Sequence, residues 1–199
     1  MQLHTIHLLL SFANKINVLK INHCLFIILK EEEGIIMLKI YEAIIEIPMG
    51  TKNKYEIDKV NDRIKLDRVL YSPMTYPAEY GYIEHTLAED NDPLDILVLA
   101  SSKTFPGCVV DARIVGYLDM VDNDEPDQKI IAVMDTDPRF SHISELADIQ
   151  QHTLREIKHF FKTYKDLQQN KKVEVYEFHD KIDALELIQV CLERYNNNK

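Results

Sequence analysis

The sequence predicts an α+β domain in which a β-barrel or β-sandwich carries helices packed against it. Short segments with strand patterning, separated by turns, recur between residues 37 and 134, and this arrangement is typical of barrels and sandwiches. Two later segments place apolar residues at helical spacing, and one more strand-like segment lies between them. A chain of 199 residues has the length of one domain, or of one domain with an appendage.

Strands are expected wherever apolar residues alternate with polar ones or form a short buried run. Gly116 lies inside the longest of these segments and marks a bulge or a close approach of two backbones. The segment 71–82 holds four tyrosines and two prolines, so it is expected to be a structured loop. In chain order, the expected strands cover residues 40–47, 54–58, 64–70, 96–100, 109–121, 129–134 and 171–178.

Two amphipathic helices are expected to pack on the strands. Asp148 followed by Gln151 resembles a capping box, which predicts the start of the first helix. Its apolar face and that of the second helix follow helical spacing. The first face consists of Ile149, Thr153, Ile157, Phe160, Phe161 and Tyr164, and the second of Ala184, Leu185, Ile188, Cys191 and Leu192.

Composition limits the classes of function. The formal net charge of -10 argues against a general nucleic-acid surface, which requires a basic stripe. The apolar runs at 8–10 and 25–29 are shorter than the roughly 18–20 residues that span a bilayer, so no membrane association is expected. The cysteines Cys24, Cys108 and Cys191 form no Cys-x-x-Cys pair, and their odd number fits a reducing, cytoplasmic location.

Residues 1–36 do not share the pattern of the rest of the chain. Lys30-Glu31-Glu32-Glu33-Gly34 can be encoded by purine-rich codons that resemble a bacterial ribosome-binding site, and Ile35-Ile36 would then be the spacer before Met37. We therefore hypothesise that the native start is Met37. The expected organisation is an N-terminal extension at 1–36 and one domain at 37–199.

The stretch Asp90-Asn91-Asp92-Pro93-Leu94-Asp95 contains the densest chemistry. Pro93 keeps it out of a helix interior, and alternation along an extended backbone points Asp90 and Asp92 the same way. A turn can then bring Asp95 to join them. Three carboxylates at the mouth of a buried strand repel one another, and a hard divalent cation relieves this repulsion. The alternative is an Asp-rich surface turn. The spacing does not fit an EF-hand loop.

A second acidic cluster follows the long strand. Taken alone it favours a solvated hairpin turn, but together with the first cluster it could complete a multi-metal site. Basic and tyrosine side chains could face the same cavity and bind phosphate oxygens. The alternatives for these are surface solubility and, for Tyr164, packing on the helix face. The acidic residues are Asp119, Asp122, Asp124, Glu125 and Asp127, and the donors are Lys54, Arg68, Lys129, Tyr76, Tyr80, Tyr164 and Lys165.

Taken in order, these motifs resemble the soluble family I inorganic pyrophosphatases over about residues 38–195. The similarity is carried by Glu46-Ile47-Pro48, Lys54-Tyr55-Glu56-Ile57-Asp58, Asp67-Arg68, Tyr76-Pro77-x-x-Tyr80-Gly81-Tyr82, the stretch from Asp90 to Asp95, Asp122, Asp127-x-Lys129 and His159-Phe160-Phe161 with Tyr164-Lys165.

The resemblance implies a five-stranded OB-like barrel with flanking helices, several Mg2+ ions per site, and hydrolysis of pyrophosphate to two phosphates. It also implies a homo-oligomer, with a hexamer favoured. In this sequence the roles fall on Asp92 for catalysis, on Asp90, Asp95, Asp127, Asp122 and Glu46 for metal, on Lys54, Arg68, Tyr80, Lys129, Tyr164 and Lys165 for substrate, and on Glu56 and Tyr76 for support.

Two departures and two rival functions remain at the level of sequence. The loop between Pro48 and Lys54 is about one residue shorter than in the typical bacterial sequence, and residues 1–36 have no counterpart in the family. An OB-type module for single-stranded nucleic acid would use the tyrosines but not the aspartates. A structural calcium-binding protein would use the aspartates but not the basic residues.

Overall fold

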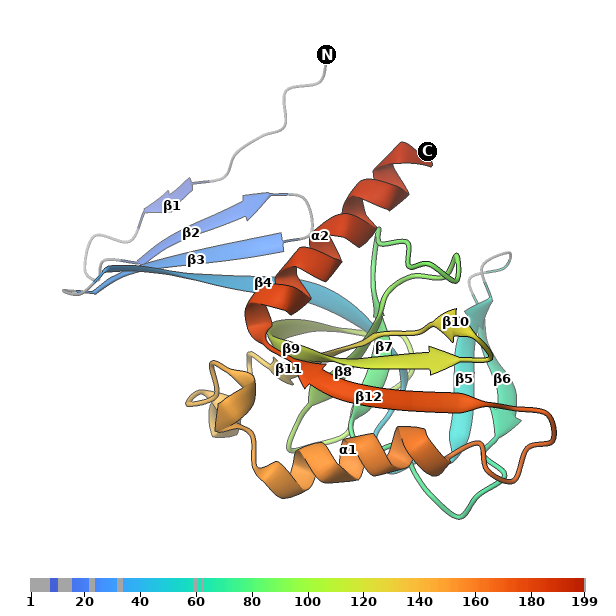
Figure 1. The fold of residues 1–199 in the computed structure, drawn as a ribbon. Helices are drawn as coiled ribbons and strands as arrows, with labels where there is room; N and C mark the ends of the chain where they lie inside the picture. Colours follow the sequence, from blue (N-terminus) through green and yellow to red (C-terminus); the bar gives the residue numbers. More distant parts are fainter. Residues whose placement is uncertain are drawn as a thin grey trace.

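A ring of five strands forms the centre of the protein (Figure 1). The computed structural model describes residues 8–10, 16–21, 24–31, 34–58, 61 and 63–198, with side chains from residue 40 onward. Around the ring run β4 (Gly34–Ile47), β7 (Glu79–Ile83), β8 (Asp95–Leu99), β11 (Lys129–Met134) and β9 (Cys108–Asp122), and β9 pairs with β4 to close it. Only the β8–β11 pairing in this ring is parallel. The predicted OB-like barrel is confirmed.

Further strands extend the ring or lie beside it. β5 (Asn53–Asp58) and β6 (Arg63–Val69) form a separate hairpin, while β10 (Glu125–Pro126) and β12 (Val173–His179) pair with β9. On the other side of β4, the backbone of β3 (Cys24–Glu31), β2 (Ile16–Ile21) and β1 (Leu8–Leu10) continues the sheet outward. The boundary expected between residues 36 and 37 therefore falls inside β4.

Two helices cover different sides of the barrel (Figure 1). α1 (Gln151–Thr163) packs on the face that includes Leu97 and Leu99, and α2 (Lys181–Asn197) packs on the face that includes Ile96 and Val98. Because successive strand residues point to opposite faces and a helix covers each face, residues 96–99 of β8 are all apolar, and only Asp95 at its start is polar. Within the described residues, neither helix is long and apolar enough to cross a membrane.

The expected loop at 71–82 was partly wrong, because its end forms strand β7. The tyrosines and prolines of this segment suggested a loop, but its end is a strand with a glycine at its centre. A Cβ atom on Gly81 would lie 1.8 Å from the carbonyl oxygen of Ile44, so only glycine allows β7 to approach β4. Gly116 confirms the expected close approach: a Cβ atom there would lie 2.4 Å from the carbonyl oxygen of His179, and the β11–β9 register shifts beside it.

The expected capping box also belongs to a different element. Asp148 accepts from the backbone N–H groups of Ser144 and Glu145 at 2.8 and 2.9 Å, and so caps the short 3-10 helix η2 (Leu146–Asp148). α1 begins three residues later, after Gln150, whose side chain makes no capping bond. The other 3-10 turn, η1 (Pro138–Phe140), begins at an Asp137 cap.

Candidate active site

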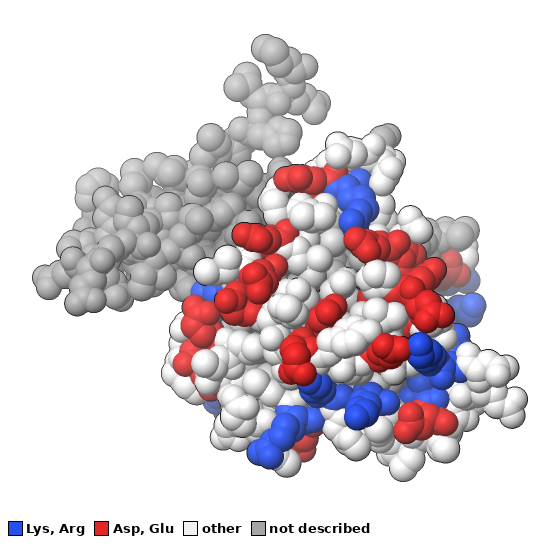
Figure 2. Space-filling model, viewed as in Figure 1, with Lys and Arg blue, Asp and Glu red and all other residues white. Residues whose placement is uncertain are grey.

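A polar cavity of about 220 Å³ opens between the end of the barrel, the β5–β6 hairpin and the end of α1. Figure 2 shows acidic side chains gathered across this face of the molecule, with basic side chains beside and below them. Most of the predicted site residues line the cavity. Its walls consist of Lys54, Arg68, Tyr76, Tyr80, Asp90, Asp92, Asp95, Asp122, Asn123, Glu125, Pro126, Asp127, Lys129, Phe161, Tyr164 and Lys165.

Lys129 connects two of the predicted metal ligands. Its side chain is only 2% exposed, and its ammonium lies 2.5 Å from Asp95 Oδ2 while also donating to Asp127 Oδ1. The same oxygen of Asp95 accepts from the Tyr80 hydroxyl at 2.5 Å. Asp95 opens β8, Tyr80 lies on β7 and Lys129 opens β11, so adjacent strands of the ring bring these groups together.

The cavity has an excess of negative charge. Six carboxylates line it against four Lys and Arg side chains. Burial raises the pKa of Asp127, and the Asp95 carboxylate raises it further against the opposing effect of Lys129. Burial alone would lower the pKa of Lys129, but Asp95 and Asp127 outweigh it and raise that pKa above its ordinary value. The raised pKa of Lys129 reflects the negative charge of its two carboxylate neighbours, whereas burial is the main cause at Asp127.

Glu46 lies beside the cavity and does not line it. It is on β4, where its Oε1 accepts from the backbone N–H of Ile57 at 2.9 Å. Burial raises the pKa of Glu46 to about 7, the Ile57 bond lowers it, and the Asp95 carboxylate raises it again. Glu46 is thus electrostatically coupled to Asp95.

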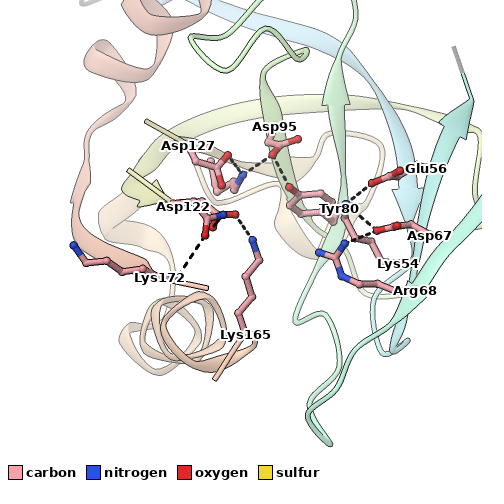
Figure 3. A network of polar contacts seen from close by, with 12 residues as sticks. Lys54, Glu56, Asp67, Arg68, Tyr80, Asp95, Asp122, Asp127, Lys165 and Lys172 are labelled. Carbon is pink, nitrogen blue, oxygen red and sulfur yellow. Dashed lines mark hydrogen bonds and ion pairs between the residues drawn. The ribbon is translucent and has the colours of Figure 1, made fainter. Parts of the chain in front are cut away.

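The β5–β6 hairpin forms a wall in which each cation has a carboxylate partner (Figure 3). Lys54 on β5 donates to Glu56 and lies 3.5 Å from Asp67, while Arg68 on β6 lies 2.5 Å from Asp67. Glu56 therefore contacts Lys54 without lining the cavity itself. The predictions omitted Asp67 as a site residue, although it immediately precedes Arg68 in the motif.

The end of α1 supplies the opposite wall. Tyr164 is the C-cap residue of α1, and its ring centroid lies 5.1 Å from that of Phe160. It also lines the cavity, so this tyrosine both packs on the helix face and belongs to the site wall. Lys165 donates to Asp122 across the cavity (Figure 3). Burial lowers the pKa of Lys165 even though Asp122 raises it. Tyr76 packs 4.9 Å from Phe160 and 5.4 Å from Tyr80, which fits a supporting role.

The loop between β7 and β8 brings Asp90 and Asp92 to the cavity. The backbone N–H of Asp92 donates to Asp90 Oδ1 at 3.0 Å, which closes a tight local turn. Asn91 between them adopts a positive φ of 67°, a conformation that asparagine tolerates better than most residues. The stretch is therefore a turn, as the alternative interpretation held, and it also presents both carboxylates to the cavity.

The second acidic cluster divides into two parts. Asn123 and Asp124, with φ values of 52° and 68°, form the tight hairpin turn between β9 and β10. Asp122 and Asp127 on either side of this turn line the cavity, as does Glu125. Asp124 is 87% exposed and lies 3.7 Å from Lys172, and neither it nor Asp119 lines the cavity. The hairpin interpretation is right for Asp124, whereas Asp119 lies within strand β9.

Some residues that line the cavity could not be assigned to the site from the local sequence. Asn123, Pro126 and Phe161 line the cavity but were not predicted to belong to the site. Phe161 was assigned only to the apolar helix face. Within the described part of the chain, no group of three or more Asp, Glu, His or Cys side chains stands ready to hold a metal ion. Asp95 and Asp127 come together through the ammonium of Lys129.

The barrel and its acidic cavity define a small β-barrel protein with a strongly polar site at one end. The family model described as inorganic pyrophosphatase matches residues 43–196. The chain belongs to the inorganic pyrophosphatase family, which confirms the resemblance read from its motifs and its expected class as an enzyme.

Individual relatives agree with this assignment. The chain is 59% identical over 157 residues to the inorganic pyrophosphatase of Halalkalibacterium halodurans, covering 79% of this chain and 96% of the relative. It is 56% identical over 161 residues to that of Geobacillus stearothermophilus, covering 81% and 97%. The crystal structure of the Thermus thermophilus inorganic pyrophosphatase matches with a TM-score of 0.77 and 45% identity, covering 79% of this chain and 91% of that one.

Proposed function

We propose that this enzyme hydrolyses inorganic pyrophosphate to two orthophosphates, with magnesium, by direct attack of water. The observation that carries the proposal is the cavity in which carboxylates outnumber cations while every cation is held by a carboxylate. A highly charged anion would be repelled by such a cavity on its own. Divalent cations reconcile the two charges.

The residues fit magnesium by their chemistry. All of the acidic groups offer oxygen, which is the ligand that this ion prefers. Magnesium is usually held by one or two carboxylates, with water and substrate phosphate completing its shell, so a ready-made cage is not required. Asp90, Asp95 and Asp127 would hold the first ion, and Asp122 and Glu46 would help to hold others or their waters. When bound, several such ions would lower the pKa of a coordinated water and neutralise phosphate charge.

The Lys and Arg side chains of the cavity would bind phosphate oxygens once their carboxylate partners bind metal ions instead. Lys54 and Arg68 approach from the hairpin, Lys129 from the barrel and Lys165 from the end of α1. Tyr80 and Tyr164 would donate their hydroxyl protons, since burial raises the pKa of both above its ordinary value and keeps them protonated. Surrounding the substrate from three sides would fix its orientation.

Asp92 would orient the attacking water or accept its proton. It lines the cavity and is the more exposed of the two loop carboxylates, so a water molecule can reach it. The donors around the leaving phosphate would stabilise the charge that develops on its oxygen. Among the residues that the structure describes, no serine or cysteine lines the cavity, and we propose water itself as the nucleophile, without a phosphoenzyme.

Phosphate release tests this function. Purified protein and pyrophosphate should yield two phosphates per substrate with magnesium, no turnover with a chelator, and inhibition by calcium. Absence of hydrolysis with magnesium would refute the proposal. A single turnover in oxygen-18 water tests direct attack, because label that enters the protein first would contradict it.

Three further proposals rest on the likeness to the family. We propose that the catalytic domain covers residues 37–199, since the family match begins at residue 43. The test is that a chain starting at Met37 should retain activity. We also propose a cytoplasmic location and a homo-oligomer, with a hexamer favoured. Cell fractionation and sedimentation equilibrium test these two. No nucleic-acid or membrane partner is proposed.

A further inference from the structure

The loop that carries Asp90 and Asp92 is tied to the last turns of α2. In Figure 1 the green loop between β7 and β8 lies beside the C-terminal part of this helix. The loop closes itself at its base, where the Thr86 hydroxyl donates to the Ile83 carbonyl at 2.5 Å and accepts from the Leu94 N–H at 2.8 Å. These bonds fix the base of the loop and leave its outer half dependent on other contacts.

Both backbone polar groups of Leu87 are satisfied by α2. Its N–H donates to the carbonyl of Cys191 at 3.0 Å, and its carbonyl accepts from Arg194 Nη1 at 2.9 Å. Nη2 of the same guanidinium lies 3.4 Å from Glu89 Oε1. Arg194 thus spans two residues of the loop at once, as a planar fork of donors can and a single ammonium cannot.

Two hydrogen bonds within the loop connect Leu87 to the acidic residues. The N–H of Ala88, which follows Leu87, donates to the carbonyl of Asp92 at 2.8 Å. Asp92 in turn donates to Asp90 Oδ1 at 3.0 Å. Moving Leu87 therefore moves both carboxylates that face the cavity. A second contact joins the same two elements, since His85 Nδ1 lies 3.3 Å from the Tyr195 hydroxyl.

The two contacts of Arg194 are expected to stabilise the loop to different extents. Its side chain is 31% exposed and that of Glu89 is 57% exposed, so their ion pair is screened by water and contributes little. The bond to the Leu87 carbonyl is charge-assisted and short, and it satisfies a group in the loop backbone. The carbonyl bond should dominate.

We propose that Arg194 is a positioning residue: it holds the Leu87–Asp92 turn so that Asp90 and Asp92 face the cavity, and it thereby sets the affinity for divalent cations. This inference rests on the proposed function, because it takes Asp90 as a metal ligand. Arg194 does not line the cavity and touches no reacting group.

The test compares magnesium binding without substrate, by calorimetric titration, in wild type and in Arg194→Met, which keeps the apolar stem but removes the donors. Groups that orient metal ligands typically contribute tenfold or more to affinity, so the dissociation constant for magnesium should rise about tenfold. Hydrogen exchange of the peptide covering 84–94 should also quicken. Arg194→Lys, which restores a charged donor to the carbonyl, should recover most of the affinity.

Arg155→Met is the matched control. Arg155 is an exposed arginine on α1 that donates to the Gln151 carbonyl of its own helix at 3.3 Å and ties down no loop. This variant should bind magnesium as wild type does. Glu89→Gln should change the affinity less than twofold, because it removes only the exposed pair.

The outcomes separate the two proposals. Equal magnesium affinity in wild type and Arg194→Met would overturn the positioning role alone. A wild-type chain that binds no magnesium would overturn the proposed function and this inference with it. If Arg194→Met fails to fold, as judged by circular dichroism, Arg194→Gln takes its place with an expected loss of about threefold, since it keeps one neutral donor.

Discussion

Nζ of Lys129 lies 2.5 Å from Oδ2 of Asp95, at the point where two parallel strands of the barrel begin. The ammonium also donates to Asp127, so one buried positive charge holds two carboxylates together. This contact explains how a barrel can keep an acidic cluster at its mouth before any metal binds. Under the proposed function, metal and Lys129 would compete for the same oxygens, so metal binding should release Lys129 toward substrate.

Lys129→Met should destabilise the metal-free protein by about 3–5 kcal/mol, because Asp95 and Asp127 would be left buried without a counter-charge. Urea unfolding in a chelator measures this loss, and added magnesium should recover part of it. The control is Lys172→Met, which removes exposed ion pairs with Glu174 and Asp124 from a lysine that is 66% exposed, and should cost less than about 1 kcal/mol. Equal losses in the two variants would contradict the role of Lys129.

Asp92→Asn should keep the fold and lose on the order of a hundredfold to ten-thousandfold in turnover, which is the usual cost of removing one general base. Steady-state phosphate release with saturating magnesium measures it. Asp124→Asn, an exposed residue outside the cavity, should hydrolyse pyrophosphate as wild type does. Wild-type turnover by Asp92→Asn would show that another group handles the water.

Stability of the metal-free protein should fall as pH rises from about 4.5 to about 7. The pKa of Glu46 is raised from 4.5 to about 7 on folding, chiefly by burial, so the folded state binds more protons than the unfolded state in this window. The loss is at most about 3 kcal/mol and levels off above pH 7. Urea midpoints at pH 5 and pH 8 in a chelator measure this.

Glu46→Gln supplies the comparison for this pH dependence. Glutamine can still accept from the Ile57 N–H but carries no charge. The variant should therefore be more stable than wild type at pH 8 and little different at pH 5. An identical pH dependence in both proteins would show that Glu46 is not the group responsible.

Gly81→Ala should cost about 3 kcal/mol or more, since its new Cβ would lie 1.8 Å from a backbone oxygen of β4 that cannot move independently. Gly50→Ala is the matched control: its φ is 74° but no atom lies within 4 Å of the added Cβ, so about 1 kcal/mol of strain is expected. Chemical denaturation compares the two. A mild effect at Gly81 would mean that β7 and β4 can separate.

Much of the fold was predictable because strand patterning is local. The run Ile96–Leu99 identified β8 by its apolar character alone, since helices cover both of its faces. β7 was missed because Tyr80 and Tyr82 suggested a loop, and the reason for Gly81 lies in another strand. Asp148 misled because a cap for a 3-10 turn has the same sequence signature as a cap for an α-helix.

Residues that line the cavity were predictable where they carry charge within an ordered motif, and contacts made by a distant part of the chain were harder to predict. Charge and position in an ordered motif made it possible to predict Asp90, Asp95 and Lys129. Arg194 does not, since an arginine near the end of a helix is ordinary and its partner Leu87 lies far away in sequence.

The central claim is that the acidic excess around Asp95 creates binding sites for divalent cations. Calorimetric titration of magnesium into wild type and into Asp95→Asn, without substrate, tests it most directly. Wild type should bind magnesium, and the variant should bind it at least tenfold more weakly, because one ligand and one negative charge are lost. Equal affinity in the two proteins would contradict the claim.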